Sequence, residues 1–180
     1  MTTQDTRYGR IAIALHWSIA VLLLAQFAFG WWLGDIARNT PARGYFINLH
    51  KSTGIVLGLL ILLRLWWRIR HAPPALPARM VSWQKGLATA SHKLMYVCML
   101  LMPLSGYTAS NFSPHGVKFF NTVVMPAWGP DNKAVYVFFN QVHKSAALVL
   151  LTLVFLHVAA AVWHATRQDG IFSRMWPRRA

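Results

Sequence analysis

The chain has 180 residues, of which 56% are hydrophobic and 12% charged, and its formal net charge at pH 7 is +14. A soluble domain carries roughly 25% charged residues, so this composition argues against an ordinary soluble enzyme. Cys98 is the single cysteine of the sequence, which excludes intrachain disulfides and metal centres held by several cysteines. We interpret Cys98 as a small packing residue.

Four apolar runs, taken in chain order, predict membrane-spanning helices at about 11–33, 46–68, 87–110 and 136–165. Each run is about 20 residues or longer, the length needed to cross a hydrocarbon core about 30 Å thick. Leu, Ile and Val occur without alternation, so a membrane β-barrel is not expected. We predict an all-α integral membrane four-helix bundle, with residues 1–180 as one transmembrane domain.

The first run is too long for the apolar core of a signal peptide, and the following "FGWWLGD" lacks a small-x-small cleavage site. It is therefore expected to stay in the protein as the first span. The second connection contains three prolines and predicts an extended basic loop. The third connection, at about 111–134, is long and only half polar, and we expect it to cap one face of the bundle.

The basic residues are distributed unevenly between the two sides of the membrane. Four spans place both termini on the same side, and the positive-inside rule assigns the more basic side to the cytoplasm. Both termini are therefore predicted to be cytoplasmic. The basic residues lie near the ends of the predicted spans and in the connections between them, so a nucleic-acid partner is not expected. The inner set is Arg7, Arg10, Arg64, Arg68, Arg70, Arg79, Lys85, Lys93, Arg167, Arg174, Arg178 and Arg179, and the outer set is Arg38, Arg43, Lys51, Lys118, Lys133 and Lys144.

Histidines occur at matching depths of the predicted bundle. "LHKSTGIVLGLL" and "VHKSAALVLLTL" begin the second and fourth spans alike, which puts His50 and His143 near the outer side. His157 lies 14 residues after His143, about 21 Å deeper along a helix and on nearly the same face. The first span runs in the opposite direction, so His16 lies at the inner depth of His157.

Two such pairs suit two haems b, each held by two imidazoles. Neutral imidazole is a common axial ligand of haem iron, and two of them leave no position for oxygen, which favours electron transfer. Ser52, Gly54 and Gly58, and Ala146 and Ala147, would leave room for the flat macrocycle. The two glycines are also typical of a plain helix-packing face.

Two further histidines, His92 and His164, lie at the inner depth. Spacing alone does not exclude either as an inner haem ligand. They could instead line a quinone pocket and exchange protons with the quinone, or be ordinary interfacial polar residues. His71 and His115 fall in predicted connections and are not expected to bind iron.

The segments "RYGRIAIALHW", "LHKSTGIVLGLLILLRLWWR", "ASHKLMYVCMLLMPLSGY", "VHKSAALVLLTLVFLHVAAAVWH" and "SRMWP" resemble, in this order, the bacterial cytochrome b561 family. The resemblance covers almost the whole chain. It implies a multi-pass protein of the bacterial inner membrane, with His16 and His157 on an inner haem b and His50 and His143 on an outer one.

The resemblance also implies an activity, because a relative in this family oxidises periplasmic superoxide and passes the electrons through two haems to ubiquinone. Arg43, Lys51 and Lys144 would then attract the anion, or else bind haem propionates or extend along the membrane surface. One alternative is an electron conduit between a periplasmic partner dehydrogenase or redox protein and the quinone pool. Another is a haem-free membrane scaffold or metal carrier.

Overall fold

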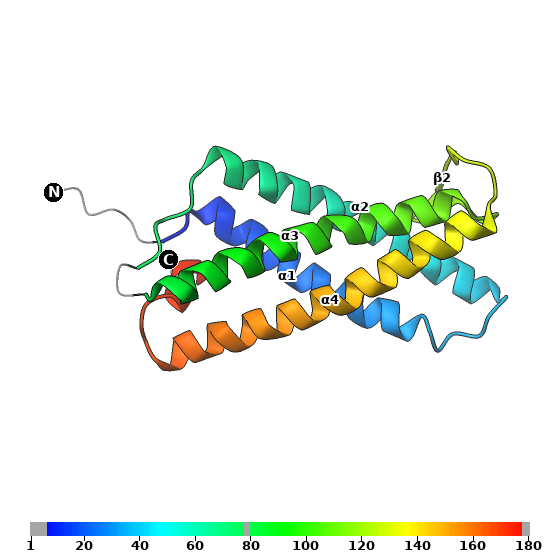
Figure 1. The fold of residues 1–180 in the computed structure, drawn as a ribbon. Coiled ribbons are helices and arrows are strands. Elements are labelled where there is room, and N and C mark those ends of the chain that lie inside the picture. The colour runs from blue at the N-terminus through cyan, green and yellow to red at the C-terminus, as the bar shows by residue number, and fades with distance from the viewer. Residues whose placement is uncertain (1–6, 78–79, 178–180) are drawn as a thin grey trace.

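The computed structural model describes residues 7–77 and 80–177. Within these residues, four long helices form a bundle (Figure 1). All four are long and apolar enough to cross a membrane, which confirms the predicted four-helix membrane fold. Their bounds are α1 Arg10–Trp32, α2 Pro41–Arg70, α3 Ser82–Asn111 and α4 Lys133–Thr166; the short elements are β1 Val117–Phe119, β2 Val123–Met125 and the 3-10 helix η1 Phe172–Met175.

Helices α2 and α4 begin earlier than the apolar runs at 46 and 136, because polar residues fix their N-termini. Thr40 caps α2 by accepting a hydrogen bond from the backbone N–H of Arg43, and Pro41 at the first helical position already has a helical φ. Asn132 caps α4 by accepting from two backbone N–H groups. Both helices therefore extend beyond the outer ends of their apolar runs.

The buried apolar core forms one layer at mid-height of the bundle. Leu150, which is 0% exposed, lies midway along α4 between His143 and His157. Large apolar side chains on the outside of the helices, such as Leu148 and Phe155, stay exposed and suit a lipid environment. The core layer therefore separates two histidine levels, and we keep the names outer for the level near the N-termini of α2 and α4 and inner for the level near η1. The members of the layer are Ile19, Leu23, Leu57, Ile61, Met95, Cys98 and Leu150.

A β-hairpin in the third connection is attached to the outer end of α2. Strands β1 and β2 pair antiparallel, with Val117 opposite Met125. The N–H of Phe120 donates to Oγ of Ser52 at 2.8 Å, and Nζ of Lys51 donates to the carbonyl of Gly116 at 2.7 Å. Phe120, in the turn between the strands, has φ 46°, an uncommon conformation for a bulky residue.

The sequence indicated a cap in this connection but not the hairpin. Ser52, a small residue expected to leave room for a macrocycle, also anchors this loop: its Oγ donates to the carbonyl of Asn48 and accepts from the N–H of Phe120.

Segment η1 ties together the other end of the bundle. The buried Arg174 donates from Nη2 to the carbonyls of Pro74 and Ala75 in the α2–α3 connection, at 2.7 and 2.9 Å. Nε1 of Trp17 in α1 donates to the carbonyl of Met175 at 2.9 Å. The first and last described segments therefore lie at the same end of the bundle, as the side view shows (Figure 1).

Candidate functional site

The outer histidine level holds one pair of imidazoles. His50 of α2 and His143 of α4 have ring centroids 6.3 Å apart and ring planes at 84°. Helices α2 and α4 start at the same end of the bundle, and each of the two rings lies about three helical turns after the cap of its helix. Both rings therefore lie at the same depth. The structure thus brings together the two residues predicted from the repeated His-Lys-Ser.

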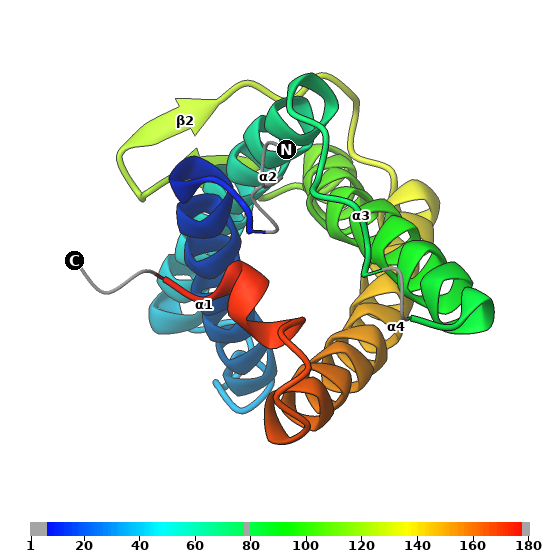
Figure 2. The same cartoon turned by 90° about the vertical axis from the view of Figure 1, so that its left-hand side faces the viewer.

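The inner level holds a pair of nearly the same geometry. His16 of α1 and His157 of α4 have centroids 6.2 Å apart and ring planes at 77°. These two helices approach each other only sparsely within the described chain, and they stand on different sides of the bundle axis (Figure 2). The two rings are therefore brought together by the bundle as a whole rather than by direct α1–α4 packing.

The separation of the rings fits two imidazoles on one iron atom. A metal lies about 2 Å from an imidazole nitrogen. The ring centre lies about 1.1 Å behind that nitrogen, so two rings on opposite sides of one metal would have centres about 6.2 Å apart. His16–His157 and His50–His143 agree with this value. His92 lies only 5.3 Å from His157, which is too short for that arrangement.

The outer pair also has nitrogens suited to binding iron. Nδ1 of His143 lies 2.8 Å from the carbonyl oxygen of Met102. A carbonyl only accepts, so Nδ1 carries the proton and Nε2 keeps its lone pair for a metal. Nδ1 of His50 is buried and has no hydrogen-bond partner among the described residues. Such an orphaned polar atom is rare in native proteins and fits a residue whose ring serves another group.

Two glycines that the sequence analysis did not single out make room for these rings. A Cβ added to Gly106 in α3 would lie 3.0 Å from Nδ1 of His143, and one added to Gly30 in α1 would lie 3.2 Å from Cε1 of His50. In contrast, a Cβ on Gly58 would meet the ring of Pro103 at 3.2 Å. Gly58 therefore belongs to the α2–α3 packing face, the alternative that its Gly-x-x-x-Gly spacing left open.

Gln26 is a polar residue of the site that sequence reasoning missed. Its Nε2 donates to the backbone carbonyl of His50 at 3.0 Å, and its Oε1 accepts from Oγ1 of Thr53 at 3.0 Å. Within a membrane such a bridge holds two helices at one rotation. The signal in the sequence was a glutamine inside an otherwise apolar span.

His92 and His164 occupy different places at the inner end. His92 packs its ring against His157. His164 pairs instead with the turn that follows α4, where its Nδ1 lies 2.5 Å from Oδ2 of Asp169. Of the histidines in predicted connections, His71 stacks on Trp67 with centroids 3.9 Å apart.

The three outer basic candidates have different contacts. Nη1 of Arg43 donates to the carbonyls of Leu33 and Ile36 at 2.6 Å each, and so closes the C-terminal end of α1. Lys51 donates to the hairpin. Lys144 is exposed on α4. Arg43 and Lys51 thus hold backbone carbonyls, whereas the side chain of Lys144 is exposed.

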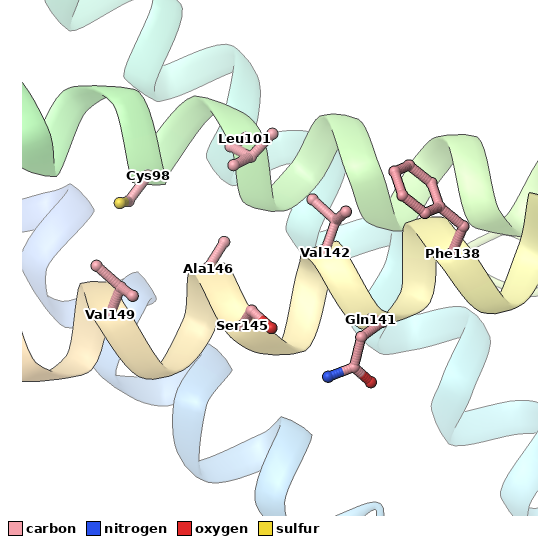
Figure 3. A pocket seen from close by; sticks show the side chains of 8 residues that line it. All are labelled: Cys98, Leu101, Phe138, Gln141, Val142, Ser145, Ala146 and Val149. Atoms are coloured by element: carbon pink, nitrogen blue, oxygen red, sulfur yellow. The ribbon is translucent and has the colours of Figure 1, made fainter.

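Two cavities of similar size differ in chemistry. One, of about 350 Å³, runs along α3 and α4 and is lined mainly by apolar side chains, including Leu101, Phe138 and Val149 (Figure 3). Apart from Cys98 its lining has no titratable group. The other, also of about 350 Å³, lies at the inner end and includes His164, Arg167 and Asp169.

The donor set at the histidine levels does not suit a bare metal ion. Among the described residues, no three or more His, Cys, Asp or Glu side chains gather where they could bind one. Pairs of imidazoles, in contrast, leave the remaining coordination positions to a macrocycle.

The sequence pattern of prokaryotic cytochrome b561 matches residues 7–178. The chain belongs to this family. Cytochromes b561 of this family are transmembrane haem b proteins of electron transfer, and the chain is accordingly a multi-pass protein of the bacterial inner membrane. This confirms the resemblance stated from the sequence and does not agree with a haem-free scaffold.

Three curated relatives match along nearly the whole chain. Cytochrome b561 homolog 2 of Escherichia coli is 28% identical over 97% of this chain and 93% of its own length. Cytochrome b561 homolog 1 of the same organism is 25% identical over 96% and 98%. Cytochrome b562 of Cereibacter sphaeroides is 26% identical over 96% and 97%.

Proposed function

We propose that this cytochrome b561 oxidises superoxide at its outer face and reduces ubiquinone in the membrane, with two haems b as the electron path. The observation that carries the proposal is that two imidazole pairs lie at two levels of one bundle. The ring centroids are 6.3 Å apart in the outer pair and 6.2 Å apart in the inner pair. Two superoxide anions lose one electron each and become oxygen. One ubiquinone gains two electrons and two protons and becomes ubiquinol.

In this proposal His50 and His143 hold the outer haem, and His16 and His157 hold the inner one. Bound haem supplies reversible one-electron chemistry of its iron. The two histidines of each pair would both bind the iron, which would leave no position for oxygen and would restrict the site to electron transfer. Leu150 and its neighbours in the core layer exclude water between the two levels.

The orientation follows from charge. We propose that the end with η1 faces the cytoplasm, because the inner set of basic residues lies at that end. Three members of the set, Arg79, Arg178 and Arg179, lie outside the described residues. The hairpin and the N-termini of α2 and α4 would then face the periplasm.

A positive outer face would draw in an anion. Six Lys and Arg residues are predicted there against Asp35 and Asp131, and like-signed charge around an entry site raises the encounter rate with an oppositely charged substrate. We propose Lys144 as the member whose charge is presented most directly, with Arg43 and Lys51 contributing to the same field.

Stopped-flow mixing of the purified dihaem protein with superoxide tests the proposal. We expect the haem α-band to appear faster than superoxide dismutates, and to decay when decylubiquinone is added. If the haems stay oxidised while superoxide disappears at its uncatalysed rate, the superoxide reaction is rejected.

A second function is favoured by the surface of the third connection. Val123, Val124 and Trp128 are 59%, 72% and 58% exposed, and exposed apolar side chains of this kind are typical of a contact with another apolar surface. They would suit a periplasmic dehydrogenase or redox protein that delivers electrons to the outer haem. If the haems of a Val124→Asp variant are reduced normally by superoxide but no longer by a periplasmic extract, the result would favour this conduit.

A further inference from the structure

We infer that the positive charge of Arg64, inside α2, raises the reduction potential of the haem at the inner level, an inference that rests on the proposed pairing of His16 with His157. Arg64 does not touch the iron or replace a ligand. It acts through the electric field of a guanidinium that three helices hold at one place in the bundle.

Arg64 occupies the place on α2 that an inner histidine occupies on α4. It follows His50 by 14 residues, which is about 21 Å along a helix and nearly the same face. The same spacing separates His143 from His157 on α4. Because α2 and α4 start at the same end and their outer histidines face each other, the inner half of α2 presents a cation where α4 presents an imidazole.

The guanidinium of Arg64 is hydrogen-bonded to both neighbouring helices at this level. Its Nη1 donates to the carbonyl of Ala12 in α1, and its Nε donates to the hydroxyl of Tyr96 in α3, each at 3.0 Å. In an α-helix the carbonyl of residue 12 also accepts from the N–H of residue 16, so the charge lies against the turn that ends at His16. Tyr96 follows His92 by four residues, about one turn. The charge is therefore fixed beside the helices that carry two inner imidazoles.

Neither acceptor neutralises the charge of Arg64. A backbone carbonyl and a hydroxyl are dipoles and carry no net charge, and none of the four acidic residues of the chain lies within α1, α2, α3 or α4. A charged side chain inside a membrane bundle is expensive and usually functional. The charge acts on the rings of His16, His92 and His157, so a group bound between these rings would also feel it.

A fixed cation favours the reduced state of a haem. On reduction the iron gains one electron and passes from ferric to ferrous, while its bonds to the two imidazoles remain. The ferric state carries one more positive charge, so a neighbouring cation repels it more strongly than the ferrous state. This interaction weakens with distance and is strong where water is excluded. The effect therefore falls mainly on the inner level, and the outer level lies about 21 Å away.

The outer level has a different cation on the same helix. Lys51 lies next to His50, and its Nζ donates to the carbonyl of Gly116 in the third connection. That charge is directed to the outer end of the bundle, whereas Arg64 is directed to the neighbouring helices. Under the proposed function electrons pass from the outer to the inner level, and a charge that stabilises the reduced inner haem favours this direction.

Four variants separate the charge from the hydrogen bonds. Arg64→Gln removes the charge, and Arg64→Lys keeps it but loses the planar guanidinium. Tyr96→Glu places a carboxylate beside Arg64, and Tyr96→Phe is its matched control, which removes the hydroxyl without adding a charge. Arg70→Gln is the control for losing a cation elsewhere, because Arg70 is exposed at the end of α2.

Redox potentiometry of the full-length protein in detergent measures the midpoint of each haem. Dithionite is the reductant and ferricyanide the oxidant, so neither superoxide nor quinone takes part. The transition that is missing in His16→Ala identifies the inner haem. We expect Arg64→Gln and Tyr96→Glu to lower the equilibrium constant for its reduction at least about tenfold, a downward shift of about 59 mV or more for one electron. Arg64→Lys, Tyr96→Phe and Arg70→Gln should keep the wild-type midpoint, and the outer haem should keep its own in all five variants.

An inner midpoint that stays at the wild-type value in Arg64→Gln and Tyr96→Glu would overturn the inference. Equal shifts in Arg64→Lys and Arg64→Gln would do the same, because they would assign the effect to the hydrogen bonds rather than the charge. So would loss of the inner haem from both of these variants, which would make Arg64 purely structural.

If Arg64→Gln alone loses the inner haem, the comparison of Tyr96→Glu with Tyr96→Phe decides, since Arg64 is present in both. A lower midpoint in Tyr96→Glu would then support the role of the charge, and equal midpoints would reject it. A wild-type protein with a single haem would overturn the proposed dihaem path and the inference with it. The haem count of the wild type distinguishes that failure from the others.

Discussion

The outer and inner ends of the bundle hold histidine pairs of nearly equal geometry in different surroundings. At the outer level His50 and His143 are packed against glycines, and a hydrogen-bonded hairpin is attached beside them. At the inner level a third imidazole, His92, touches the pair, and the acidic, basic and aromatic groups around His164 line a cavity. Under the proposed function, this difference corresponds to a division of chemistry, with electrons entering at the outer end and meeting protons at the inner end.

The largest expected effect comes from removing one ligand of the outer pair. His50→Ala and His143→Ala should each lose the outer haem and keep the inner one, so the haem content falls from two to one per chain and reduction by superoxide is lost. The pyridine haemochrome assay and a dithionite-reduced spectrum measure this. Two haems per chain in either variant would reject the pairing.

The inner level offers a comparison between two histidines that both contact His157. We expect His16→Ala to lose the inner haem, because the 6.2 Å ring separation suits a shared iron atom. We expect His92→Ala to keep both haems and to slow quinone reduction, because its 5.3 Å separation does not suit one. If His92→Ala holds only one haem per chain, His92 rather than His16 would be the haem ligand.

A smaller effect is expected from filling the space beside an outer ligand. Gly106→Ala would place a Cβ 3.0 Å from the ring of His143, and overpacking of this kind costs about 1–3 kcal/mol. We expect a lower thermal stability and a shifted spectrum or potential of the outer haem alone. Gly86→Ala, in the same helix and with nothing within 4 Å of the added atom, is the control. Equal behaviour of the two variants would remove the steric role of Gly106.

The smallest effect concerns the charge of the outer face. Lys144→Glu should slow reduction by superoxide a few-fold at low salt and flatten its dependence on ionic strength, because screening acts on exposed charges. Lys93→Glu, an exposed lysine near the inner end, should leave the superoxide rate unchanged. Identical rates for Lys144→Glu and wild type would show that this side chain does not steer the anion.

The predicted bundle and the histidine depths rest on properties that act along the chain. Apolar length fixes the number of spans, and a rise of about 1.5 Å per residue fixes the depth of each histidine once the spans are known. For that reason His50 could be placed level with His143, and His16 level with His157, before the helices were packed. The additional residues at the starts of α2 and α4 come from Thr40, Pro41 and Asn132, whose capping chemistry is also local.

Depth alone did not decide which inner imidazoles face each other. His16, His92 and His157 share one level. The rotation and spacing of their three helices set the ring-centroid distances, which are 6.2 Å from His16 to His157 and 5.3 Å from His92 to His157. The roles of Gly30 and Gly106 also required the packed bundle, because a missing Cβ matters only where a ring from another helix approaches it. The Asp169 partner of His164 depends on the turn after α4, which has no periodic signal.

The sequence by itself determined a four-span membrane protein with histidines at two heights, because hydrophobic length and helical rise are properties of each segment alone. The tertiary structure decided which side chains meet across helices: the rings that share a spacing suited to iron, the glycines that admit them, and the cavity beside His164. Those contacts depend on how far apart the helices lie and how they are rotated, and no single segment encodes that.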